Sequence, residues 1–157
     1  MKRIRVNEDV CIGCRLCEIS CVVEHSLSRD LVKAFKSESP PALSRISVRQ
    51  AKDGFLPVRC LHCPQPACVD ACLTGALSRD PSSGLVLYDA TRCVGCWTCV
   101  IACPFGAITP DAARQSIAKC DMCPDLDVPA CVAGCSNRAL TLEEAPVEAT
   151  VSGSVER

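Results

Sequence analysis

The residues able to do chemistry in this chain are its sixteen cysteines, all of which fall into four groups that open with a Cys-x2-Cys step. Four thiolates hold one [4Fe–4S] cluster, so sixteen can hold four clusters with none left over. The groups are Cys11, Cys14, Cys17 and Cys21; Cys60, Cys63, Cys68 and Cys72; Cys93, Cys96, Cys99 and Cys103; and Cys120, Cys123, Cys131 and Cys135. The pattern predicts a carrier of single electrons.

The third group follows the bacterial ferredoxin spacing, C-x2-C-x2-C-x3-C-P, with Pro104 in the last position. Three closely spaced thiolates in one loop can hold three corners of a cluster, and the fourth cysteine binds the neighbouring cluster. The first group has the same spacing, with Val22 in place of the proline. The second and fourth groups lengthen the middle gap and keep the closing x3 step.

Zinc and disulfides are the alternatives to iron–sulfur clusters. Cys-x2-Cys pairs also bind zinc, but zinc sites are not built from Cys-x2-Cys-x2-Cys triplets, so zinc stays open only for the loosely spaced group at Cys120–Cys135. Residues 1–10 contain no apolar signal-peptide region, and the chain has no apolar run of membrane-spanning length. We therefore expect a cytoplasmic, reducing location, where dense cysteines indicate metal binding.

The composition leaves little material for an ordinary core, because aromatic residues make up 3% of the chain and the 48% hydrophobic fraction includes the cysteines. Small scaffolds of this kind need metal or covalent staples, so folding should be coupled to cluster insertion. A net charge of -1 gives no electrostatic case for binding nucleic acid or an anionic membrane.

The repeated unit is strand, cysteine loop, helical turn and strand, which predicts an α+β fold. Short strands are expected at 4–6 and 85–88, helical turns at 17–21 and 99–103, a helix over 26–36, and a hairpin from 45–49 and 55–59. We predict one four-cluster domain over 1–141, with an inner unit at about 55–110, an outer unit from 1–25 plus 115–141, an insertion at 26–54, and a C-terminal tail at 142–157.

Single residues near the cysteines carry weaker signals. Gly13 and Gly95, each between the first two cysteines of a group, predict tight turns with positive φ. Arg15, Arg92 and Lys119 could raise cluster potentials, but isolated charges are expected at the surface.

The remaining polar and aromatic residues near the cysteines predict no catalytic site. His62, inside the second group, is expected either near the cluster or exposed, and Trp97 is expected to take part in ordinary packing. His25 and Glu24 are expected at the surface, so no catalytic residue is predicted.

Spacing alone leaves two ways to pair the groups: two with three and one with four, or one with two and three with four. The short link from Cys72 to Cys93 favours the first, because it is the geometry of a two-cluster ferredoxin.

The groups at 11–21 and 93–108, together with Lys119-Cys120-Asp121-Met122-Cys123, resemble the four-cluster iron–sulfur subunits of larger redox complexes, over about residues 3–141. Such subunits serve molybdenum or tungsten enzymes, among them formate dehydrogenase, dimethyl sulfoxide reductase and aldehyde oxidoreductase, and also carbon monoxide dehydrogenase and hydrogenase complexes. The resemblance implies two ferredoxin-like dicluster units with these ligand sets: Cys11, Cys14, Cys17 with Cys135; Cys120, Cys123, Cys131 with Cys21; Cys60, Cys63, Cys68 with Cys103; and Cys93, Cys96, Cys99 with Cys72.

The expected partner is then a catalytic redox subunit, most simply a molybdenum or tungsten enzyme, together with a flavin protein or ferredoxin as the second redox partner. Subunits with a C-terminal membrane helix serve quinone-linked enzymes, and the lack of such a helix here favours a soluble partner. A carbon monoxide dehydrogenase or hydrogenase subunit, and a free polyferredoxin, are the alternatives. Apolar docking patches are expected beside the outer clusters, and two such ends could also let copies of the chain stack.

Overall fold

The computed structural model describes residues 2–52 and 54–144, and it is built from short elements. In this part of the chain, antiparallel two-stranded sheets form from β1 (Lys2–Val6) with β8 (Leu140–Glu144), β2 (Ile46–Ala51) with β3 (Gly54–Arg59), β4 (Leu77–Arg79) with β5 (Val86–Tyr88), and β6 (Thr109–Asp111) with β7 (Ser116–Ala118). The helices are α1 (Leu16–Glu24), α2 (Leu31–Lys36), α3 (Ala67–Asp70), α4 (Thr98–Ala102) and α5 (Ala130–Ala133), with 3-10 turns η1 (Glu8–Val10) and η2 (Ala90–Arg92). Helices and strands are thus mixed, as predicted.

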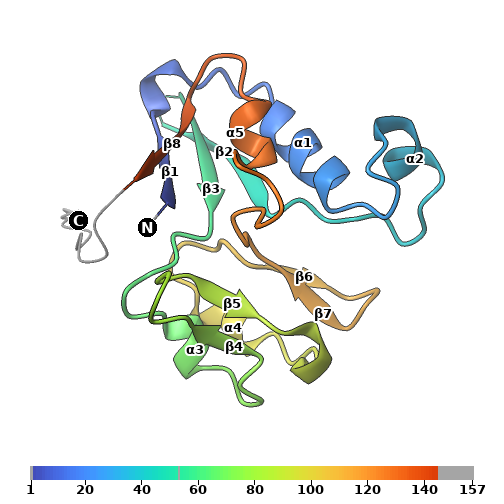
Figure 1. Cartoon of the computed structure of the whole chain (residues 1–157), viewed down its shortest axis with the longest axis vertical. Helices are drawn as coiled ribbons and strands as arrows, with labels where there is room; N and C mark the ends of the chain where they lie inside the picture. The colour runs from blue at the N-terminus through green and yellow to red at the C-terminus, as the bar shows by residue number, and fades with distance from the viewer. Residues whose placement is uncertain (1, 53, 145–157) are drawn as a thin grey trace.

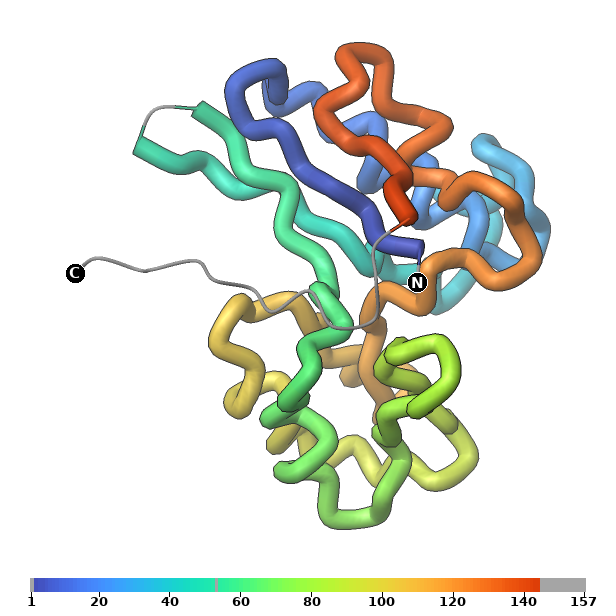
Figure 2. The backbone as a smooth tube through the Cα atoms, turned by 60° about the vertical axis from the view of Figure 1, so that its left-hand side comes forward, coloured from blue at the N-terminus to red at the C-terminus, as the bar shows by residue number. Residues whose placement is uncertain are grey.

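These elements gather in two lobes (Figure 1). One lobe holds α1, α2, α5 and the sheets β1–β8 and β2–β3, and the other holds α3, α4 and the hairpins β4–β5 and β6–β7. Figure 2 shows the chain crossing between the lobes after β3 and returning after β7. Each crossing leads directly into the first cysteine of a group, Cys60 or Cys120.

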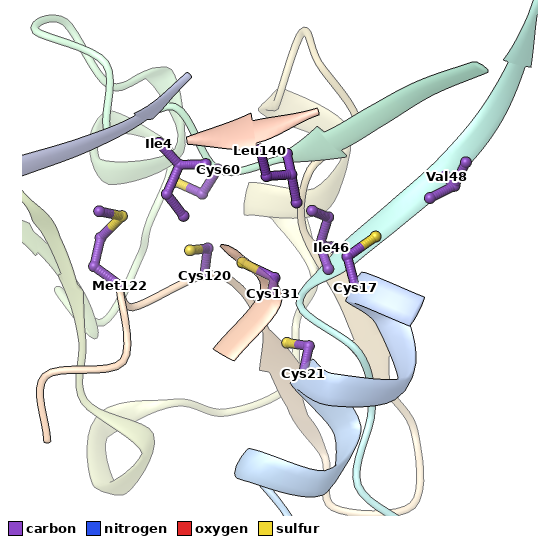
Figure 3. Packing of buried hydrophobic residues seen from close by; sticks show 10 residues of the cluster. All are labelled: Ile4, Cys17, Cys21, Ile46, Val48, Cys60, Cys120, Met122, Cys131 and Leu140. Atoms are coloured by element: carbon purple, nitrogen blue, oxygen red, sulfur yellow. The ribbon is translucent and has the colours of Figure 1, made fainter. Parts of the chain in front are cut away.

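Each lobe has its own small core in which cysteines replace much of the usual aliphatic material. Figure 3 shows Cys21, Cys60, Cys120 and Cys131 among aliphatic side chains of the first lobe; the aliphatic members of that cluster are Ile4, Ile46, Val48, Met122 and Leu140. In the second lobe Cys68 and Cys99 are buried with Leu77, Val86, Ile108 and Ile117. The space around the thiols is therefore apolar.

The hairpin predicted at 45–49 and 55–59 is present as β2–β3, but the helix predicted over 26–36 is shorter. It begins at Leu31 because Asp30 caps it, its carboxylate accepting the Lys33 backbone N–H at 2.9 Å. Residues 26–29 form a turn instead, which is held by the Glu38 carboxylate accepting the backbone N–H of Ser28 at 2.9 Å.

The last strand reaches further than expected. β8 pairs with β1 as far as Glu144, in a register that places Leu142 opposite Ile4 and Leu140 opposite Val6. Residues 142–144, which were predicted to belong to the tail, are therefore part of the sheet. Leu140 and Leu142 alternate with polar residues, as expected for a strand with one buried face. The remainder of the predicted tail, 145–157, lies outside the described residues.

Candidate metal centres

The first lobe brings together thiols from opposite ends of the chain. Cys11, Cys14, Cys17 and Cys135 line one cavity, with Val48 and Leu140 in its wall. Burial raises the pKa of the Cys17 thiol to about 11, and the negative charges of Glu18, Cys135 and Cys14 add to this rise.

A second set of thiols lies deeper in the same lobe. Cys120, Cys123, Cys131 and Cys21 are all buried. Burial raises the pKa of Cys131 strongly, and repulsion from the thiolates of Cys120, Cys21 and Cys123 raises it further. These four sulfur atoms are therefore close enough to influence one another's ionisation.

Two comparable sets are centred on the second lobe, and one of them includes Cys60 at the lobe junction. Burial raises the pKa of Cys68 to about 11, and the charges of Cys60, Cys103 and Cys63 add to that rise. Around Cys99, burial is again the largest cause of the raised pKa, followed by repulsion from Cys72, Cys96 and Cys93. Each set joins three cysteines of one group to the last cysteine of another: Cys60, Cys63, Cys68 with Cys103, and Cys93, Cys96, Cys99 with Cys72.

The packing of helices in pairs brings the last cysteine of one group to the first three cysteines of another. In the first lobe α1 packs against α5, and in the second α3 packs against α4. Cys17 and Cys21 lie four residues apart on α1, so one turn of helix carries a thiol of each of two sets. A pair of packed helices therefore places two sets of thiols side by side.

The loops that carry the first cysteines of groups one and three need glycine. Gly13 and Gly95 have φ of +69° and +67°, as predicted, which L-residues with a side chain rarely adopt. At Gly95 a Cβ atom would also lie 2.7 Å from the backbone carbonyl oxygen of Gln115 in the turn between β6 and β7. The absent side chain thus lets the hairpin close over the cysteine loop.

Buried N–H donors without acceptors lie next to these thiols. His62 is 2% exposed, and its Nδ1 accepts the Val86 backbone N–H at 2.9 Å, which leaves the proton on Nε2. Burial, followed by the nearby charges of Lys119 and Arg59, lowers the pKa of His62 to about 3, so the ring is neutral. Neither His62 Nε2 nor Arg59 Nε has a hydrogen-bond partner among the described residues.

The chemistry of the donor set fits an iron–sulfur cluster. Closely packed thiols in an apolar space resist ionisation, whereas a coordinating metal deprotonates them outright. Buried donors that lack acceptors suit a bound group that carries negative charge and accepts hydrogen bonds, as cluster sulfur does. The four sets of thiols are of the right chemistry for such clusters, and the two unpartnered donors, on His62 and Arg59, directly precede Cys63 and Cys60 in the chain.

A polar network beside Cys21 corrects the expectation that His25 lies free at the surface. His25 Nδ1 lies 2.8 Å from the Cys21 carbonyl oxygen and 3.6 Å from its sulfur, and Nε2 lies 3.2 Å from an Asp121 carboxylate oxygen. Arg45 pairs with Asp121, and its backbone N–H donates to Cys21 Sγ at 3.2 Å. Burial alone would lower the pKa of His25, but the hydrogen bonds to Asp121 and Cys21 raise it to about 9.

One signal for this network was present in the sequence, since His25 follows Cys21 by four residues and so shares its helix face. No sequence signal pointed to Asp121 or Arg45, because tertiary packing alone brings these two residues close to His25 and Cys21. The ligand atoms of His25, Asp121 and Cys123 lie within 4.8 Å of one another. The cysteine group at Cys120–Cys135 therefore stays compatible with zinc as well as with an iron–sulfur cluster.

Two thiols are exposed, one in each lobe. They are Cys14 and Cys96. Exposed apolar side chains stand in the same cysteine groups, with Ile12 beside Cys14 and Val94 beside Cys96, and Ile101 follows on α4. The surfaces at these two positions are therefore partly apolar. Among the described residues, no helix has the length and apolarity needed to cross a membrane.

Cysteine thiols gathered in this way are typical of iron–sulfur proteins. The chain belongs to the 4Fe-4S dicluster domain family, which matches residues 51–145. Its sixteen cysteines are consistent with two dicluster units and four [4Fe–4S] clusters.

Curated relatives are named for electron transport and for oxidoreductase subunits. Electron transport protein HydN of Escherichia coli (strain K12) is 37% identical over 147 residues, covering 83% of this chain and 81% of HydN. The polyferredoxin-like subunit of aliphatic sulfonate oxidoreductase from Pyrococcus furiosus is 37% identical over 121 residues, covering 76% of this chain and 64% of that subunit. A subunit of the sulfite dehydrogenase of Allochromatium vinosum is 34% identical over 131 residues, covering 76% of this chain and 55% of its own length.

A solved structure shares the fold. The active-site complex BamBC of benzoyl coenzyme A reductase, determined with 1,5-dienoyl-CoA, contains a chain that superposes with a TM-score of 0.53. The match covers 100% of this chain and 83% of that one, at 24% sequence identity. At this identity the similarity shows a common fold only.

Proposed function

We propose that this protein is a non-catalytic electron-transfer subunit of the polyferredoxin type that carries four [4Fe–4S] clusters in two ferredoxin-like dicluster units. The proposed ligand sets are Cys11, Cys14, Cys17 with Cys135; Cys120, Cys123, Cys131 with Cys21; Cys60, Cys63, Cys68 with Cys103; and Cys93, Cys96, Cys99 with Cys72. When bound, such clusters accept and release single electrons.

One observation carries this proposal: in all four places, three thiols of one group meet the last thiol of another. Burial is the largest cause of the raised pKa of Cys17, Cys68, Cys99 and Cys131, and repulsion from the other thiols of each set adds to it. A disulfide scaffold would bring thiols together in pairs, so gathering by fours favours cluster ligation.

The placement of the thiols supports the proposal that redox sites lie at both ends of the protein. Cys60 and Cys120 lie in the same buried cluster, so their two sets are neighbours across the lobe junction. The remaining sets contain the exposed Cys14 and Cys96. We infer that the thiols of Cys14 and Cys96 mark the two docking faces, one in each lobe.

The proposed partner is the catalytic subunit of an oxidoreductase, most simply a molybdenum or tungsten enzyme. Two relatives are named as oxidoreductase subunits, for aliphatic sulfonate and for sulfite, which supports a subunit role over a free shuttle. The free polyferredoxin remains the second candidate, because HydN is named only as an electron transport protein. A carbon monoxide dehydrogenase or hydrogenase partner would use the same two faces.

The test is iron and acid-labile sulfide analysis of anaerobically purified protein, with EPR of the dithionite-reduced form. Four cubane clusters require about sixteen irons per chain. Cys135→Ser should disturb the cluster held by Cys11, Cys14 and Cys17, although Cys135 is more than a hundred residues away. About twelve irons and one zinc would assign the group at Cys120–Cys135 to zinc, and thiols paired in disulfides without iron would refute the proposal.

A further inference from the structure

The junction between the lobes buries two cationic side chains. Lys119 is 3% exposed and Arg59 is 7% exposed. Arg59 is the last residue of β3 and Lys119 directly follows β7, the two strands after which the chain crosses between the lobes (Figure 2). Buried cations are normally paired with carboxylates. Neither of these two forms an ion pair with an acidic side chain in the described part of the chain.

Their hydrogen bonds fix these cations in place without neutralising them. Lys119 Nζ donates to the carbonyl oxygens of Val86 at 2.5 Å and Cys120 at 2.8 Å, so it ties β5 of one lobe to the cysteine loop of the other. Arg59 donates to the Cys60 carbonyl oxygen at 2.7 Å. Carbonyl oxygens satisfy N–H donors but carry no net charge, so the two positive charges still need a counter-charge.

The groups that face these cations are thiols of two neighbouring sets. Arg59 lies within electrostatic range of Cys60, Cys120 and Cys131. Its positive charge favours the ionised forms of Cys120 and Cys131. Lys119 acts in the same way on Cys68 and Cys120. One cation pair is thus shared by the set that ends in Cys103 and the set that ends in Cys21.

We propose that Arg59 and Lys119 are positioning residues that set the reduction potentials of the two clusters meeting at the lobe junction, by acting as their buried counter-charge. This inference rests on the proposed cluster ligation. A cluster held by four thiolates gains one unit of negative charge when it takes up an electron, and no proton transfer is needed to balance that step. Fixed positive charge in a buried site favours the reduced form and raises the potential.

The chain supplies a matched control. Arg92 precedes Cys93 as Arg59 precedes Cys60 and Lys119 precedes Cys120, but its side chain is exposed and donates to the Thr74 carbonyl oxygen at 2.9 Å. Water and salt screen an exposed charge. Arg92→Gln should therefore leave the potentials almost unchanged, whereas Lys119→Gln, which keeps an N–H donor and removes the charge, should lower them.

The experiment is an EPR-monitored redox titration of anaerobically purified variants with full iron content. For Lys119→Gln and for Arg59→Gln we expect the ratio of reduced to oxidised junction cluster to fall about tenfold at a fixed solution potential. For a one-electron couple this corresponds to a lowering of the midpoint potential by about 59 mV. Lys119→Arg should restore the wild-type ratio. Unchanged potentials in both glutamine variants, or an equal shift in Arg92→Gln, would overturn the inference.

Iron content separates the possible failures. Wild-type protein without iron–sulfur clusters would refute the proposed function before any variant is compared. If the glutamine variants lose iron while Lys119→Arg keeps it, the positive charge is required to hold the clusters, which supports the counter-charge role. If Lys119→Arg loses iron as well, side-chain shape rather than charge matters at this position, and the inference fails.

Discussion

Substitution of the two equivalent glycines in the cysteine loops should have different effects. Gly13 and Gly95 occupy the same place in the repeated Cys-x-Gly-Cys sequence and have nearly the same φ, +69° and +67°. What differs is the neighbour that an added methyl group would meet. At Gly13 it is the Phe55 ring, at 2.6 Å, and at Gly95 it is the backbone carbonyl oxygen of Gln115, at 2.7 Å.

The size of each effect follows from these contacts. Placing alanine in the left-handed region costs about 1–2 kcal/mol at either position. The Phe55 ring is 37% exposed and can rotate away, so Gly13→Ala should cost little more than this. The Gln115 carbonyl moves only with the β6–β7 turn, and overpacking against fixed atoms adds about 1–3 kcal/mol. Gly95→Ala should therefore be the more harmful change by roughly tenfold in stability, since 1.4 kcal/mol is a factor of ten.

The assay is the rate at which visible cluster absorbance is lost in guanidinium chloride under anaerobic conditions, because cluster loss makes unfolding irreversible. A double-mutant comparison tests the cause. Phe55→Ala should remove part of the penalty of Gly13→Ala, whereas Gln115→Ala should not relieve Gly95→Ala, since the obstructing atom belongs to the backbone. Equal cluster-loss rates in the two single variants, or rescue by Gln115→Ala, would refute this reasoning.

Three further results are expected. Leu140→Ala should destabilise the protein by about 2–5 kcal/mol, measured as faster loss of visible cluster absorbance in guanidinium chloride, because Leu140 is 2% exposed in the first core. Asp30→Ala should cost about 1 kcal/mol through loss of the α2 cap, visible as faster amide exchange in α2 with unchanged iron content. Iron chelation should abolish near-UV circular dichroism, because eight of the twenty-two buried apolar residues in the described part of the chain are cysteines; a native-like apoprotein would contradict this.

Local sequence patterns predicted the backbone of the cysteine loops. The Cys-x2-Cys-x2-Cys loops, the x3 step to the last cysteine and the positive φ at Gly13 and Gly95 follow from rules that act within one short segment. The β2–β3 hairpin is equally local. In contrast, the approach of Cys21 to Cys131 depends on α1 packing against α5, which no local rule specifies.

The clearest failures concern burial. Arg92 and Lys119 look alike in sequence, each standing directly before a Cys-x2-Cys pair, and both were expected at the surface. Arg92 is exposed, whereas Lys119 is buried because β7 ends at the lobe junction and directs its side chain toward Val86. His25 was likewise expected at the surface, and its contact with Asp121 spans 96 residues of sequence. Such differences arise from the tertiary arrangement and leave no periodic signal.

The two lobe crossings explain why a fold with so thin a core keeps charges inside it. Arg59 ends β3 and Lys119 follows β7, so a long basic side chain stands where each crossing strand meets its first cysteine. Without bound anionic groups, two buried cations that lack carboxylate partners would oppose lobe closure. With clusters in place, the same charges would attract the thiolate sets on both sides of the junction. Lobe association should therefore be stronger in the metal-loaded protein, so the residues proposed to tune the clusters would also couple lobe assembly to cluster insertion.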